Sequence, residues 1–215
     1  VVYDLLSGKV TFAWDGKTET VERKDCFHEG AILLHVPQNT RVTITAETGT
    51  EVAVARTENK RSFEARLMRP EDCLCANEER GAGQMNECST RMVRTFFDRS
   101  NCPETNFFIG EVVHFPGKWS SYPPHQHVEP EMYYYKFLPE NGDGLAEYGD
   151  DAYKVKHNDR TGMPANVTHS QAAAPGYAEY YLWCIRLQDD KNIITTTVKE
   201  YEWVTAPDAK YFPDI

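Results

Sequence analysis

Several features that would place a protein in a particular class are missing from this sequence. Among its 215 residues no apolar run approaches the roughly 18 residues of a membrane span, and no secretory signal precedes the first strand-like segment. Basic residues are outnumbered, 23 against 33 acidic ones, which gives a formal net charge of −10. We therefore expect a cytoplasmic protein with neither membrane nor nucleic acid as a partner. Since the sequence opens on Val1 without a methionine, the true N-terminus is open.

Cysteine is also scarce, and no two cysteines have the C-x-x-C spacing of zinc or thioredoxin-type sites. Buried free thiols are therefore the expectation for this sequence, in preference to disulfides. The six cysteines are Cys26, Cys73, Cys75, Cys88, Cys102 and Cys184.

What the sequence does contain is enough apolar material for a core, at 40% hydrophobic and 12% aromatic residues. This suffices for one large or two small domains. Two alternating runs, Lys9–Trp14 and Lys17–Val21, flank the dipeptide Asp15-Gly16. The pattern predicts a β-hairpin with a type I′ turn.

Short β-rich runs continue along the chain, separated by Gly, Pro and Asn, and no long stretch keeps a helical period. Such a pattern is typical of an all-β sandwich or barrel. The further predicted strands are Ala31–Val36, Arg41–Thr45, Val52–Ala55, Thr105–Phe115, Met132–Leu138, Ala152–Val155, Tyr180–Leu187 and Ile193–Tyr201.

The least strand-like stretch, Met68–Ser100, suggests a connector between two halves. A weak internal echo agrees with this division, because Pro37-Gln38-Asn39 and Pro164-Ala165-Asn166 each precede a predicted strand. Nothing in the first half resembles the histidine pair described next. We predict an N-terminal half without a metal site (1–67), a connector (68–100) and a C-terminal half with a metal site (101–215).

The most informative residues are a cluster of potential metal ligands. His125 and His127 lie two apart, so an extended strand presents both imidazoles to one face. Glu131 follows Pro130 at the head of the next strand, and His169 opens another strand after a turn. Three histidines and a carboxylate make a typical set for one divalent ion and leave a coordination position for water or substrate. We predict a metal site formed by His125, His127, Glu131 and His169.

The alternatives to these ligands are also visible in the sequence. Glu129 competes with Glu131, and we prefer Glu131 because Pro130 makes the stretch around Glu129 a turn. The isolated histidines are expected to be ordinary packed or exposed side chains. They are His28, His35, His114 and His157.

Longer motifs surround these ligands. Trp119-Ser-Ser-Tyr-Pro-Pro-His125-Gln-His127, Tyr133-Tyr-Tyr135-Lys-Phe137 and Ala173-Ala-Pro-Gly-Tyr177 resemble the 5-deoxy-glucuronate isomerases of myo-inositol catabolism, kin of the uronate isomerases. The resemblance is strong over the C-terminal half. It implies a bicupin, with two cupin-type (jelly-roll) β-barrels and few short helices, and one metal ion in the second barrel. Zinc is the first choice, with Mn, Fe, Co and Ni as alternatives.

The resemblance implies an aldose–ketose isomerase that acts on a small sugar acid, and it is compatible with a homo-oligomer. Moving a carbonyl between adjacent carbons passes through an enediolate whose charge a divalent ion stabilises. Strand alternation places Tyr133 and Tyr135 on the face of Glu131, and Gln171 on that of His169. We predict catalytic roles for Tyr133 and Glu131 and substrate binding by Gln171 and Tyr135.

Three questions stay open at this point. The general base is metal-bound hydroxide, Glu129 or a tyrosine, and the cation for the substrate's acid end is Lys118, Lys136 or Arg186. The family pattern is broken at Val128 and at Val167-Thr168, which leaves the exact sugar acid open. A cupin dioxygenase or decarboxylase, another uronate isomerase, and a non-catalytic sugar-acid binding protein are the alternative functions.

Overall fold

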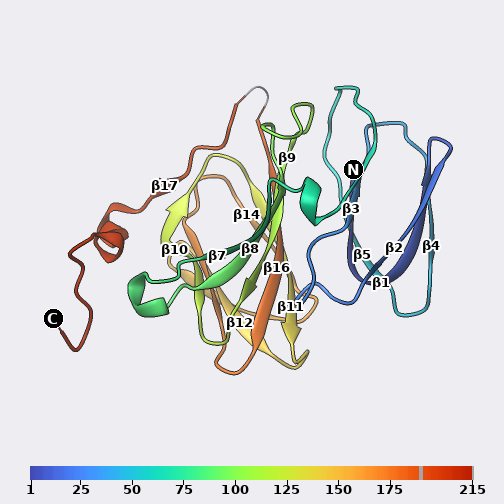
Figure 1. The fold of residues 1–215 in the computed structure, drawn as a ribbon. Coiled ribbons are helices and arrows are strands. Elements are labelled where there is room, and N and C mark those ends of the chain that lie inside the picture. The colour runs from blue at the N-terminus through green and yellow to red at the C-terminus, as the bar shows by residue number, and fades with distance from the viewer. Residues whose placement is uncertain (189–190, 215) are drawn as a thin grey trace. The chain divides into compact units, whose positions relative to one another are not determined.

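The computed structural model describes residues 1–188 and 191–214, and strands dominate it (Figure 1). The chain divides into two compact units. The first comprises residues 1–77 and 94–110, and the second comprises residues 78–93 together with the described residues from 111 onward. The predicted all-β class is confirmed. The predicted boundaries at 67/68 and 100/101 stay a prediction.

The N-terminal part of the chain forms strands joined by tight turns. They are β1 (Val2–Trp14), β2 (Lys17–Arg23), β3 (Leu33–His35), β4 (Val42–Ala46), β5 (Glu51–Ala55) and β6 (Arg66–Met68), and the short 3-10 helix η1 (Pro70–Asp72) follows them. The hairpin prediction is confirmed, since Trp14 pairs with Lys17 and both Asp15 (φ 44°) and Gly16 (φ 76°) have the positive φ of a type I′ turn.

Strand β1 is central to this unit because it pairs with four other strands, two along each of its halves. Its first half pairs with β3 and β5, and its second half pairs with β2 and β4. The register shifts between Leu5 and Ser7, and Gly8 follows with φ 92°. The bulge lets one strand leave one sheet and enter the next. Phe12, Trp14 and Leu34 pack in the core that the two sheets enclose.

The rest of the chain supplies the second barrel. Its elements are β7 (Cys75–Arg80), η2 (Met85–Glu87), β8 (Arg91–Phe97), β9 (Phe107–His114), β10 (Trp119–Gln126), β11 (Glu131–Leu138), β12 (Asp143–Tyr148), β13 (Asp151–Lys156), β14 (Arg160–Met163), β15 (His169–Ala173), β16 (Ala178–Arg186), β17 (Thr196–Thr197) and η3 (Lys199–Thr205). One sheet has the order β13-β12-β15-β10-β17 and the other β14-β11-β16-β9-β8-β7. The boundary between the units passes through β8 and β9.

Strand β11 shows how the sequence directs side chains into this barrel. Glu131, Tyr133 and Tyr135 are buried, whereas Met132 between them is 56% exposed. This is the alternation expected of a strand with one face toward a core. The predicted placement of both tyrosines on the face of Glu131 is therefore confirmed.

Several stretches differ from the strand prediction, including β12 and β14, which were not predicted. Two of the differences have a clear physical reason. Of the predicted strand Ile193–Tyr201 only Thr196 and Thr197 pair, and they pair with the end of β10. The β-branched residues there have no buried face to occupy, since Ile194 is 76% exposed, and the chain turns into η3. Conversely, β7 and β8 lie within the stretch predicted to be least strand-like, where Val93, Phe96 and Phe97 give β8 a buried apolar face.

The described chain has only short helices and no disulfide bonds. Within residues 1–188 and 191–214 every helix is a short 3-10 turn, and none has the length and hydropathy that a bilayer crossing by a helix requires. None of the six cysteines forms a disulfide, but the expectation that the thiols are buried holds for only two of them. Only Cys26 and Cys102 are fully buried, and Cys88 is exposed.

The corner of β1 gives a stability prediction. A Cβ at Gly8 would lie 2.7 Å from the Cα of Thr50, whereas a Cβ at Gly16 meets nothing within 4 Å. Both positions have positive φ, so both substitutions strain the backbone. We expect Gly8→Ala to lower the free energy of unfolding by roughly 2–4 kcal/mol and Gly16→Ala by about 1 kcal/mol. Urea unfolding measures both, and equal losses would contradict the close approach of β1 and Thr50.

Candidate metal centre

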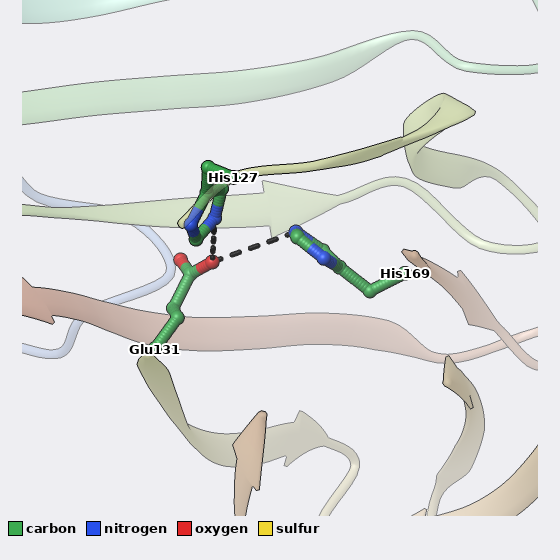
Figure 2. Close-up of side chains that lie close together, drawn as sticks. All are labelled: His127, Glu131 and His169. Atoms are coloured by element: carbon green, nitrogen blue, oxygen red, sulfur yellow. Dashed lines mark hydrogen bonds and ion pairs between the residues drawn. The ribbon is translucent and has the colours of Figure 1, made fainter. Parts of the chain in front are cut away.

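Three buried side chains from different segments of the second unit converge on one point (Figure 2). His127 follows β10, Glu131 opens β11 and His169 opens β15. The Nε2 atoms of His127 and His169 lie 3.1 Å and 3.5 Å from Oε2 of Glu131. All three offer ligand atoms within 4.8 Å of one another, so the group could hold a metal ion.

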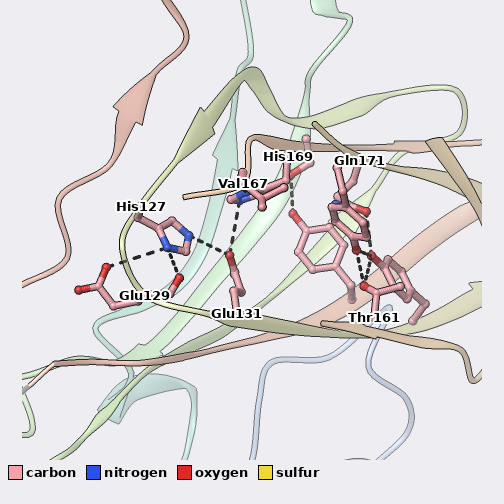
Figure 3. A network of polar contacts seen from close by, with 11 residues as sticks. His127, Glu129, Glu131, Thr161, Val167, His169 and Gln171 are labelled. Carbon is pink, nitrogen blue, oxygen red and sulfur yellow. Dashed lines mark hydrogen bonds and ion pairs between the residues drawn. The ribbon is translucent and has the colours of Figure 1, made fainter. Parts of the chain in front are cut away.

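Backbone carbonyls orient both imidazoles (Figure 3). Nδ1 of His127 donates to the carbonyl of Glu129 at 2.8 Å, and Nδ1 of His169 donates to the carbonyl of Val167 at 3.2 Å. Each bond keeps a proton on Nδ1 and directs the lone pair of Nε2 toward Glu131. Both rings therefore turn the same nitrogen toward Glu131.

The protonation of these groups matches a metal site. Burial and the neighbouring His125 lower the pKa of His169 to about 3, so this ring is neutral at pH 7. Its Nε2 is buried and has no hydrogen-bond partner among the described residues. A buried lone pair without a hydrogen-bond donor or a metal ion as its partner lowers the stability of the fold. A metal ion would satisfy this atom.

His127 and Glu131 share a proton in the absence of an ion. Burial raises the pKa of Glu131. Burial alone would lower the pKa of His127, but the hydrogen bonds and charges of Glu131 and Glu129 together outweigh it and raise this pKa. A metal must displace the proton between them to reach both ligand atoms. Metal affinity should therefore increase with pH as this shared proton is lost.

His125 lies beside the group of three. It pairs with His169 in the register of β10 and β15, and the two ring centroids are 4.5 Å apart. Hydrogen bonds with the backbone at Pro123 and Ser121 hold its ring, and burial lowers its pKa to about 4. The structure thus brings together three of the four predicted ligands, while the full set with His125 stays a prediction.

Glu129, the rival of Glu131, lies on the other side of the His127 ring. Its carbonyl accepts from Nδ1, and its own carboxylate is 4.0 Å from the same nitrogen. This places Glu129 behind a ligand and away from the point where Nε2 atoms converge. Its buried Oε2 has no hydrogen-bond partner in the described chain.

A cluster of hydroxyl groups lines the barrel next to this centre. The hydroxyl of Tyr135 donates to Oε1 of Gln171 at 2.8 Å and lies 3.2 Å from the hydroxyls of both Tyr148 and Thr161, which also contact each other. Nε2 of Gln171 is buried and unused. The cluster fixes the amide and leaves one donor free in the interior.

Tyr148 and Thr161 are not evident from the sequence. They stand on β12 and β14, far along the chain from Tyr135, and no motif marks them. The register of β12 against β15, which pairs Tyr148 with His169, is the feature that brings Tyr148 to the site.

Tyr133 lies between the centre and the tyrosine cluster. Its ring centroid is 6.2 Å from that of His169 and 4.6 Å from that of Tyr181. Burial, followed by the carboxylate of Glu131, raises the pKa of Tyr133 well above its usual value. Tyr133 therefore stays a protonated phenol that can donate a hydrogen bond.

A second buried polar pair lies among the strands of the same barrel. Nδ1 of His114 is 3.7 Å from Oε1 of Glu179, and both side chains have no exposed surface. Burial lowers the pKa of His114 to about 3 and raises that of Glu179 to about 8, so the contact joins two neutral groups rather than an ion pair. Gly144 makes room for the carboxyl, because a Cβ there would lie 2.0 Å from Oε2 of Glu179.

Comparison with known proteins points to one family. The profile of the KduI/IolB family matches residues 1–204. Two curated relatives bear the name 5-deoxy-glucuronate isomerase: one from Geobacillus kaustophilus (strain HTA426), 31% identical over 190 residues, and one from Geobacillus thermodenitrificans (strain NG80-2), 29% identical over 193 residues. The matches cover 81% and 83% of this chain. The chain spans only 63% and 64% of those relatives.

Solved structures agree on the fold. An IolB-like protein from Salmonella typhimurium LT2 superposes with a TM-score of 0.80 at 23% identity and covers 94% of this chain and 81% of its own. A glyoxylate-induced protein from Pseudomonas aeruginosa follows with a TM-score of 0.59 at 13% identity, with coverages of 89% and 68%. The predicted cupin-type, all-β architecture is confirmed.

The His114–Glu179 pair predicts a pH dependence of stability. Because the pKa of Glu179 rises from 4.5 to about 8 on folding, the folded chain holds a proton that the unfolded chain releases within this window. Glu179 thus lowers stability as pH rises from about 4.5 to 8, by at most about 1.4 kcal/mol per pH unit, and the loss levels off above that window.

Glu179→Gln removes this effect and leaves the other groups in place. We expect the variant to gain stability relative to the native chain between about pH 5 and 8, with the gain levelling off above. Urea unfolding at several pH values measures the difference, in which the titration of His114 largely cancels. Parallel curves for the two proteins would show that Glu179 is already ionised in the folded state.

Proposed function

Because the chain belongs to the KduI/IolB family, we propose that it is an aldose–ketose isomerase that converts 5-deoxy-D-glucuronate to 5-dehydro-2-deoxy-D-gluconate in myo-inositol catabolism. The observation that carries the proposal is the buried group of His127, Glu131 and His169, whose ligand atoms converge and in which Nε2 of His169 has no hydrogen-bond partner among the described residues. The names of the relatives support the choice of substrate. Because this chain spans only part of their length, their activity is carried over to it as a proposal.

The metal is one divalent ion, held by His127, Glu131 and His169 with His125 as the fourth ligand. Zinc is the first choice by resemblance to the family, and Mn, Fe, Co and Ni are alternatives for the same donor set. When bound, such an ion acts as a Lewis acid that stabilises the negative charge of an enediolate. The proposal includes a cytoplasmic location and is compatible with a homo-oligomer, as expected from the sequence.

The reaction moves two protons and leaves the redox state of the molecule unchanged. A base takes the proton from C2 of the aldose, the C2 hydroxyl gives up its proton as the ketone forms, and protons return to C1 and to the former carbonyl oxygen. Tyr133 is protonated and buried, so it serves as a donor to a substrate oxygen. Glu129 and a tyrosine remain the protein-derived choices for the base.

The hydroxyl cluster provides the means to orient the sugar. Gln171 can donate from Nε2 to a substrate oxygen, because Tyr135 already occupies its Oε1. Tyr148 and Thr161 support Tyr135 from the other side. The buried wall also excludes water from an enediolate, which would otherwise exchange its protons with solvent.

Replacing two ligands tests the metal site directly. We expect His127→Ala with His169→Ala to lower the metal content from about one ion per chain to near zero, because only Glu131 and His125 remain. Elemental analysis after metal loading and dialysis gives the content. His28→Ala serves as the matched control, since His28 is an exposed histidine that bonds to Asp25 in the other unit. Full occupancy in the double variant would contradict the site.

The reaction is tested on the metal-loaded native chain. Proton NMR under anaerobic conditions should show 5-deoxy-D-glucuronate converted to the ketose, with solvent deuterium incorporated at C1 if the proton exchanges. Binding without turnover would instead indicate a sugar-acid binding protein. Turnover that consumes oxygen would indicate a cupin oxygenase.

A further inference from the structure

Arg91, at the start of β8, is a cation with unused hydrogen-bonding capacity. The sequence offered Lys118, Lys136 and Arg186 for the acid end of the substrate, and Arg91 was not among them. Its Nη1 donates to the carbonyl of Ser89 at 2.7 Å and lies 3.4 Å from the Ser89 hydroxyl. Its Nε is buried and has no hydrogen-bond partner within the described chain.

The Arg91 guanidinium has no carboxylate partner among the described residues. In the part of the chain that the structure describes, no Asp or Glu lies within ion-pair distance of Arg91. The nearby Glu78 acts on it only at longer range and is itself paired with Arg80 at 2.6 Å. A largely buried arginine is normally matched by an anion, because desolvation of the charge costs free energy.

Arg91 is close to the wall of the candidate metal centre. The side chains of Tyr181 and Tyr133 are near enough to influence the pKa of Arg91, and the charge of Arg91 helps to lower the pKa of His125. The segment before it is fixed to β10, since the amide of Trp119 donates to the carbonyl of Cys88 at 2.8 Å. The next residue on β10, Ser120, bonds to the Tyr181 hydroxyl at 2.5 Å.

We propose that Arg91 binds the carboxylate of the sugar-acid substrate and so determines specificity for uronates over neutral aldoses. This inference rests on the proposed isomerase function. With Nη1 held by Ser89, the edge formed by Nε and Nη2 is left for a carboxylate, and two parallel N–H groups match its two oxygens. Binding would give the buried charge its missing counterion.

The sequence-based candidates are less suitable. Arg186 is exposed at the end of β16. The ammonium of Lys136 lies 3.4 Å from Asn158, on the face of β11 opposite Glu131. Arg91 combines partial burial, an unused Nε and a position near the tyrosines of the centre.

The test compares the binding and turnover of two substrates by metal-loaded variants of this chain. One is 5-deoxy-D-glucuronate, and the other is the same aldose with a primary alcohol in place of the carboxylate. We expect Arg91→Gln to weaken binding of the uronate by roughly 10- to 100-fold, as loss of a charged hydrogen-bonded pair would, and to raise KM more than it lowers kcat. Binding of the neutral aldose should not change.

Two further variants sharpen the comparison. Arg91→Lys keeps the charge but loses the fork, so it should recover part of the uronate affinity. Arg186→Gln is the matched control and should leave the binding of both aldoses unchanged. Thermal unfolding confirms that each variant is folded.

The outcomes separate this inference from the proposed function. Equal losses on both aldoses, or an unchanged Kd for the uronate in Arg91→Gln, would overturn the role of Arg91. A native chain that binds the uronate without isomerising it would overturn the isomerase proposal alone, because the Kd comparison needs no turnover. A native chain that binds neither aldose would overturn both.

Discussion

Two hydrogen bonds from imidazole Nδ1 atoms to backbone carbonyls are the constraint on which this site depends. The carbonyls of Glu129 and Val167 fix the tautomers of His127 and His169, so that both Nε2 atoms face Glu131. A carbonyl of the main chain cannot rotate away as a side chain can. The turn that carries Glu129 and the loop that ends at Val167 are therefore as important to the centre as its ligands.

The protonation of the polar groups in the second barrel changes with their distance from the metal centre. Near the metal centre the groups are ligands with displaceable protons, farther along β11 they are phenols kept protonated by burial, and the His114–Glu179 pair is neutral. Ionisable side chains also occur elsewhere in this interior, at Glu111 and Lys136. Arg91 adds a cation whose Nε is buried and unused. An anionic substrate between the metal centre and Arg91 would meet a complementary charge at each end.

Local patterns predicted what local physics determines. The Asp15-Gly16 turn, the alternation of Glu131, Tyr133 and Tyr135, and the strand opening at His169 follow from backbone and pleat geometry. The prediction of a strand over Ile193–Tyr201 was wrong for most of its length. A segment of high β propensity forms a strand only where it has a neighbouring strand to pair with and a face to bury. Tyr148, Thr161 and Arg91 could not be found, since sheet register and burial bring them to the site and neither is visible in one sequence. The orientation of His125 is likewise a tertiary property.

A crystal structure of the metal-loaded chain, with anomalous scattering recorded at the absorption edge of the ion, tests the central claim most directly. The account predicts one strong peak at about 2.0–2.2 Å from Nε2 of both His127 and His169 and from a carboxylate oxygen of Glu131. A peak bonded to Nδ1 of either ring, or a peak elsewhere in the molecule with these three side chains empty, would contradict it.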